Sequence, residues 1–169
     1  MDIREAADKL GARLPLGERQ ARLPPALRRL HRRILSAFRE RGRPLSKAEV
    51  GREAGAGDPA AALRALAERD LVVLGGDGEV VGAYPFTTAP TPHRLSFGGH
   101  DVYAMCALDA LGVAPLFETT VAIASSCAGT GEPIHLVQAG TEVVEARPSR
   151  QVHLGIRWQA GEGAAADTL

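Results

Sequence analysis

Cys106 and Asp109 are the two residues whose types and spacing most directly suggest chemistry in this 169-residue sequence. They are three positions apart in a segment predicted to be helical, so their side chains are expected on one face of the helix. A thiolate is a soft metal ligand and a nucleophile, and its pKa falls near a helix N-terminus. A carboxylic acid beside it can deliver or accept a proton. The pair therefore predicts a reactive sulfur with its own acid–base group.

Cys106 has an alternative interpretation, because free cysteine is commonly a small, buried core residue. Its apolar neighbours are Ala104, Met105, Ala107 and Leu108. Composition alone favours this alternative. The other cysteine, Cys127, ends a predicted strand. The two cysteines are far apart in a chain without an export signal, so we expect free thiols and no disulfide.

Helices dominate the prediction for the first part of the chain. They are expected at residues 25–42, 46–54 and 58–70, after a helical leader at 1–22. Apolar residues recur at helical spacing in the first of them. Ser46 and Glu49 have the spacing of a capping box. Asp58 before Pro59 is a helix start, since proline at the first helical position loses no hydrogen bond.

A β-hairpin is predicted directly after these helices. Residues 71–74 and 79–84 are apolar and β-prone, and they flank a Gly-Gly-Asp-Gly turn. Three helices followed by a hairpin are typical of a winged helix-turn-helix. Residues 1–84 are therefore predicted to form a leader and a winged-helix-like module.

The second half of the chain is predicted to be a small β core that carries the Cys/Asp helix. Prolines and a glycine pair at 85–100 break regular structure and indicate a connector. A short helix is expected around 102–111, followed by four strands. The strands are placed at 119–125, 134–137, 143–144 and 152–158. We therefore predict an α+β protein with a mainly antiparallel core at 101–169.

Charge and hydropathy limit the classes of partner. Residues 1–54 carry a net charge of +7 and residues 55–169 a net charge of −7, so the basic half can pair with acidic groups of its own chain. No apolar stretch is long enough to span a membrane, and a cytoplasmic location is expected. The predicted recognition helix offers only Arg64 and Arg69 as basic groups and has no Asn or Gln for base readout, so nucleic acid is not expected as a partner.

Two longer motifs surround the cysteines. Residues 102–111 read VYAMCALDAL, and residues 119–134 read TTVAIASSCAGTGEPI. Together they closely resemble the core of the organomercurial (alkylmercury) lyases. The resemblance extends over about residues 25–157, because that family also begins with a winged-helix-like module and a proline-rich connector.

The resemblance implies protonolysis of a carbon–mercury bond, with two thiolates on the metal and a carboxylic acid that protonates carbon. Cys106 matches the first thiolate, Asp109 matches the proton donor, and Cys127 matches a structural cysteine. The second catalytic thiol of the family has no counterpart after Cys127 in this sequence. We therefore expect a short member in which mercury is not held between two protein sulfurs. Weaker stand-in ligands would be His100, His135 or His153.

Three functions remain open. The first is an enzyme of the lyase type that uses Cys106 and Asp109 on an organometal or on another small molecule, without a cofactor. The second is a non-catalytic protein that binds mercury or copper through Cys106, Asp109 and Cys127. The third is a DNA-binding regulator built on the winged helix. The sequence does not indicate an oligomeric state.

Overall fold

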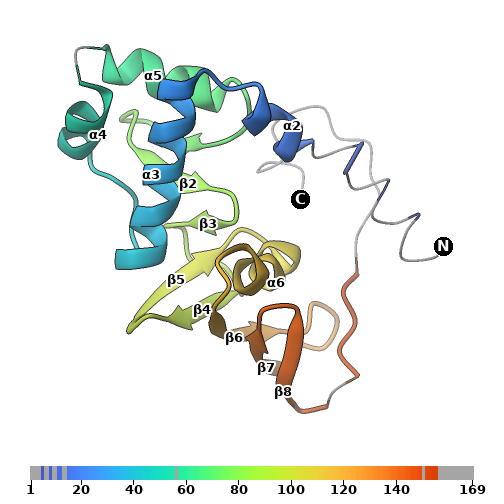
Figure 1. Ribbon diagram of the computed structural model, residues 1–169. Helices are drawn as coiled ribbons and strands as arrows, with labels where there is room; N and C mark the ends of the chain where they lie inside the picture. Colours follow the sequence, from blue (N-terminus) through green and yellow to red (C-terminus); the bar gives the residue numbers. More distant parts are fainter. Residues whose placement is uncertain are drawn as a thin grey trace.

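The structure of this chain, a computed structural model, describes Glu5, Asp8 and residues 11–12, 15–55, 57–149 and 151–155. Helices α3, α4 and α5 gather at one end of the molecule, and β6, β7 and β8 lie at the other (Figure 1). The helices are α2 (Leu16–Ala21), α3 (Pro25–Arg41), α4 (Lys47–Ala54), α5 (Pro59–Ala67) and α6 (Ala107–Leu116). The strands are β1 (Val73–Leu74), β2 (Val80–Ala83), β3 (Phe86–Thr87), β4 (Arg94–Phe97), β5 (His100–Ala104), β6 (Thr120–Ser126), β7 (Pro133–Ala139) and β8 (Glu142–Arg147).

The N-terminal helices begin where their capping residues predict, although α5 ends at Ala67, three residues before its expected end. Ser46 accepts a hydrogen bond from the Glu49 amide while the Glu49 carboxylate accepts one from the Ser46 amide, so the capping box is confirmed. Asp58 caps α5 by accepting from the Ala60 amide. α3 stops at Gly42, whose φ of 66° is left-handed and whose missing Cβ leaves room for the carbonyl oxygen of Asp101 on β5.

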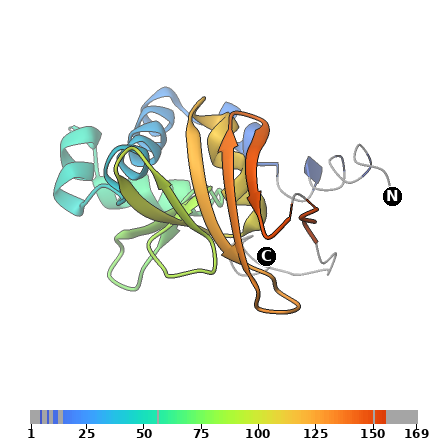
Figure 2. The ribbon, with the colours of Figure 1, turned by 90° about the horizontal axis from the view of Figure 1, so that it is seen from below.

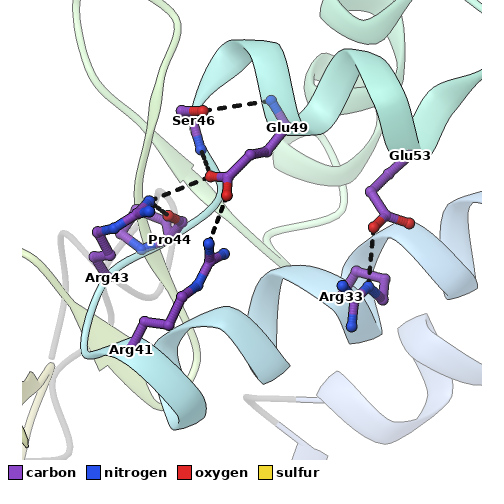
Figure 3. Close-up of polar contacts among 7 residues, drawn as sticks. All are labelled: Arg33, Arg41, Arg43, Pro44, Ser46, Glu49 and Glu53. Carbon is purple, nitrogen blue, oxygen red and sulfur yellow. Dashed lines mark hydrogen bonds and ion pairs between the residues drawn. The ribbon is translucent and has the colours of Figure 1, made fainter.

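Arginines of the basic half pair with carboxylates of the same chain. Glu49 accepts from Arg41 and Arg43, and Glu53 accepts from Arg33 at 3.0 Å, so the contacts tie α3 to α4 (Figure 3). The hydrogen bond from Arg41 is the largest cause that lowers the pKa of Glu49 to about 2. These carboxylates belong to the basic half itself, so they do not offset its excess charge. The ion pair between Arg19 and Asp70, at 2.9 Å, joins the basic half to the acidic half, as the sequence predicted.

A single sheet runs through the described part of the chain, in the order β1-β2-β3-β5-β4-β6-β7-β8 with antiparallel neighbours. Facing residues of adjacent strands form one apolar row on its covered face, and the row consists of Val102, Leu95, Ile123 and Leu136. α6 packs on β5, β6 and β7, and Figure 2 shows it behind these strands. The mixed architecture with an antiparallel sheet confirms the predicted fold class, whereas the winged-helix assignment stays a prediction.

Three expectations about individual segments were wrong. The segment 85–100 is not free of regular structure, because it contains β3 and β4, which join the sheet. The division of the chain into two modules stays a prediction. Val102 to Ala104 end strand β5 instead of starting a helix, and the helix begins at Ala107. Residues 152–155 form no strand, and the rest of the strand expected at 152–158 lies outside the described residues.

No helix within the described residues is long and apolar enough to cross a bilayer.

α6 runs past Gly112 to Leu116 and includes Pro115. Proline has no amide hydrogen, so it cannot donate to the carbonyl of Leu111 one turn earlier. The side chain of Gln138 on β7 replaces this donor, because its Nε2 lies 3.0 Å from the Leu111 oxygen and 2.9 Å from the Gly140 oxygen. Gln138 therefore connects the helix that carries Asp109 to the sheet below it.

We expect Gln138→Leu to destabilise the protein by about 1–3 kcal/mol, because it leaves the partly buried carbonyl groups of Leu111 and Gly140 without this donor. Gln138 is only 5% exposed, so water cannot easily replace the amide. Urea unfolding followed by circular dichroism measures the loss. His135→Leu on the exposed side of the same strand is the control and should change stability by about 0.5 kcal/mol or less. Equal stability of both variants would contradict this role of Gln138.

Candidate active site

Cys106 lies at the junction between β5 and α6. Its backbone is extended, with φ −146° and ψ 177°, and it is the N-cap residue of α6. Its sulfur accepts a hydrogen bond from the Asp109 amide at 3.4 Å, as a serine or aspartate does in the usual cap. The sequence predicted Cys106 inside the helix. In the structure it lies immediately before the first helical residue.

The thiol of Cys106 and the carboxylate of Asp109 are in direct contact. Sγ donates to Asp109 Oδ2 at a distance of 3.1 Å, and both side chains are half-buried. Two hydrogen bonds thus join the residues, one through the carboxylate and one through the amide. The structure brings together the pair that the sequence singled out, with the thiol as donor and the carboxylate as acceptor.

Burial sets the protonation of this pair. Desolvation, followed by the negative charge of Asp109, raises the pKa of Cys106 to about 11, although backbone amides at the helix start favour the thiolate. Desolvation also raises the pKa of Asp109, against the opposing effect of its hydrogen bonds with Cys106. The expectation that the helix N-terminus lowers the thiol pKa was therefore wrong, because burial outweighs the helix. At neutral pH the sulfur keeps its proton.

His93 reaches the same end of the sheet, and sequence reasoning missed it. Its carbonyl accepts from the Ala104 amide at 2.9 Å, so it lies beside the strand that leads to Cys106. Its Nδ1 is 2.8 Å from the Ser125 hydroxyl, and burial lowers its pKa. The sequence around it, a Thr-Pro-His run before a strand, does not by itself indicate a site. The role of His93 depends on Ser125, which lies 32 residues later in the chain.

Cys127 is held in the turn after β6 and does not join the Cys106–Asp109 pair. Its amide donates to the Glu132 carbonyl, and its own carbonyl accepts from Gly131. It is half-buried, and hydrogen bonds led by the Thr130 side chain lower its pKa. Across the residues that the structure describes, no three His, Cys, Asp or Glu side chains meet to hold a metal ion. In this geometry neither Cys127 nor a stand-in histidine adds a third ligand to Cys106 and Asp109, and their role toward a metal stays a prediction.

Comparison with known proteins finds one family. The family model for alkylmercury lyase matches residues 86–169. The chain is 46% identical over 81 residues to an alkylmercury lyase of Staphylococcus epidermidis and 41% identical over 81 residues to one of Bacillus cereus. These matches cover 48% of this chain and 37% of each relative, so the chain spans well under half of their length.

A solved structure agrees with these sequence matches. The crystal structure of the mercury-bound form of MerB2 superimposes with a TM-score of 0.64 at 25% sequence identity. The match covers 78% of this chain and 65% of that one. The likeness therefore extends beyond the segment that the family model matches.

Proposed function

We propose, from the premise that this chain belongs to the alkylmercury lyase family, that it breaks the carbon–mercury bond of small organomercurials. In this proposal Cys106 binds the metal and Asp109 carries the proton. The same pair would serve a related electrophile if the substrate has diverged. The observation that carries the proposal is the 3.1 Å contact between the Cys106 sulfur and Asp109 Oδ2.

The contact accounts for every proton in the reaction. An organomercurial cation meets a protonated sulfur, since the pKa of Cys106 is about 11. Mercury bonds to sulfur, and the displaced proton passes to the Asp109 carboxylate that already accepts it. The carboxylic acid then protonates the carbon, the carbon–mercury bond breaks, and the hydrocarbon leaves. Asp109 is again a carboxylate, and mercury remains on Cys106.

The metal then needs a further soft ligand. Cys106 and Asp109 supply one sulfur, and a soft cation is held tightly by more than one soft donor. Cys127 lies in no group with them that could hold a metal. We infer that a thiolate from solution completes the coordination and removes the metal, which makes turnover dependent on added thiol.

Release of benzene from phenylmercury in excess small thiol tests the proposal. We expect catalytic release by the wild-type chain and none above the thiol-only background for Cys106→Ser. Cys127→Ser is the matched control and should retain activity, because Cys127 is not in contact with Asp109. No benzene from wild-type protein would overturn the proposal. Stoichiometric mercury binding without benzene would instead support the non-catalytic metal-binding function.

A further inference from the structure

The loop between β3 and β4 holds the backbone that leads into Cys106. At the far end of the β4–β5 pairing, His93 and Ala104 lie side by side, and the Ala104 amide donates to the His93 carbonyl at 2.9 Å. In a regular antiparallel pair of this kind, the His93 amide would donate back to the Ala104 carbonyl. In this structure the His93 amide does not donate to the Ala104 carbonyl.

The hydroxyl of Thr91 is inserted between these two groups. The His93 amide donates to Thr91 Oγ1 at 3.1 Å, and Thr91 Oγ1 donates to the Ala104 carbonyl at 2.7 Å. The side chain thus relays the hydrogen bond that the two backbones do not form directly. Pro92, which separates Thr91 from His93, has no amide hydrogen and cannot supply another donor here.

The relay fixes one particular peptide group. The Ala104 carbonyl belongs to the same planar unit as the Met105 amide. The Met105 amide donates to the Pro85 carbonyl at 3.1 Å. Thr91 and Pro85 therefore hold the two ends of the Ala104–Met105 peptide, which is the last but one before the Cys106 side chain.

The orientation of this peptide determines where the sulfur lies. Cys106 has a non-helical, extended backbone and caps α6, so its position is set by the strand before it and by the helix after it. On the helix side, Asp109 holds the sulfur through its amide and its carboxylate. On the strand side, the hydroxyl of Thr91 is a side-chain contact to the Ala104–Met105 peptide.

We propose that Thr91 is a positioning residue, whose hydroxyl fixes the Ala104–Met105 peptide and so keeps the Cys106 sulfur against the Asp109 carboxylate. Its importance for catalysis rests on the proposed function, but its effect on the thiol does not. Loss of the hydroxyl should loosen the junction, admit water to the sulfur and weaken the thiol–carboxylate contact.

The test measures the alkylation rate of Cys106 by iodoacetamide at pH 8, in a Cys127→Ser background with one remaining thiol. The wild-type thiol should react slowly, because its pKa is about 11. Thr91→Val should react about tenfold faster or more, since each unit by which a thiol pKa falls gives about ten times more thiolate. Thr91→Ser retains a hydroxyl and should restore the slow rate.

Thr88→Val is the matched control, because Thr88 Oγ1 makes a similar bond to a backbone carbonyl, that of Val81 at 3.1 Å, away from Cys106. It should leave the alkylation rate unchanged. Thr91→Ala loses the same hydroxyl without added bulk and gives the result if the valine variant does not fold. A slow rate in folded Thr91→Val or Thr91→Ala, or equal acceleration by Thr88→Val, would overturn the proposal. This assay contains no mercury. Its result therefore does not depend on whether the protein has the proposed lyase activity.

Discussion

Asp109→Asn is expected to slow benzene release from phenylmercury about 100-fold or more while mercury still binds to Cys106. General acid catalysis contributes about 10²–10⁴-fold, and the N–H groups of an asparagine amide are far too weakly acidic to protonate carbon. The negative charge of Asp109 is one cause of the raised Cys106 pKa. Removing that charge lowers the thiol pKa, so the sulfur should still capture mercury, with its proton lost to water instead of to Asp109.

Single-turnover mixing of protein with equimolar phenylmercury separates these two steps. Bound mercury is measured after gel filtration, and benzene is measured by gas chromatography. Asp101→Asn is the control, because Asp101 is an exposed carboxylate on the strand that precedes Cys106 and pairs with Arg94 at 3.5 Å. It should release benzene at the wild-type rate. Asp109→Asn within about threefold of wild type would show that the proton comes from elsewhere.

The sequence predicted those elements whose signals are local. The capping box of Ser46 and Glu49 and the start at Asp58 depend on residues within one helical turn, so they can be read without knowledge of tertiary contacts. The β1–β2 hairpin follows from its glycine-rich turn, although its strands are shorter than expected. The pairing of Cys106 with Asp109 belongs to the same class, because three residues of spacing are enough to bring them together.

The change from strand to helix at Cys106 could not be predicted from local sequence signals. Short apolar runs such as the one at 102–105 fit a strand and a buried helix equally well. The decision comes from partners, since Val102 faces Leu95 and Ala104 faces Phe86 across the sheet. Cysteine is also outside the usual set of N-cap residues, so its capping role had no sequence signal.

The electrostatics of the site and the contacts of the loop between β3 and β4 depend on tertiary structure for the same reason. A helix start alone predicts an acidic thiol, but burial by the surrounding fold reverses the direction of the pKa shift. Thr91 acts on Ala104, thirteen residues later, and the prolines around it hide the fact that strands flank the loop. A proline-rich stretch therefore predicted a connector where the structure has two strands and a loop that is hydrogen-bonded to the strand before Cys106.

Phe86→Ala is expected to lower the free energy of unfolding by about 3–5 kcal/mol, the range for removal of a buried phenylalanine. Phe86 is fully buried in β3 and faces Ala104 of β5. Its ring stacks on Phe38 of α3 at 5.5 Å between centroids and on Phe117 at the end of α6 at 5.7 Å. Each aromatic pair contributes about 0.5–1.5 kcal/mol beyond its buried area. The ring thus joins the N-terminal helices to the helix that carries Asp109.

Urea unfolding followed by far-ultraviolet circular dichroism measures this loss as a shift of the midpoint at constant slope. Phe117→Ala is the comparison, because Phe117 is only half-buried and has Arg39 over its ring at 5.4 Å. Removing the Phe117 ring creates a smaller cavity, so Phe117→Ala should lower the free energy of unfolding by less than Phe86→Ala. Because Phe86 contacts elements from both halves of the chain, its loss should also speed alkylation of Cys106. A loss below about 1 kcal/mol, or a Cys106 thiol as protected as in wild type, would show that the two halves are held together by other contacts.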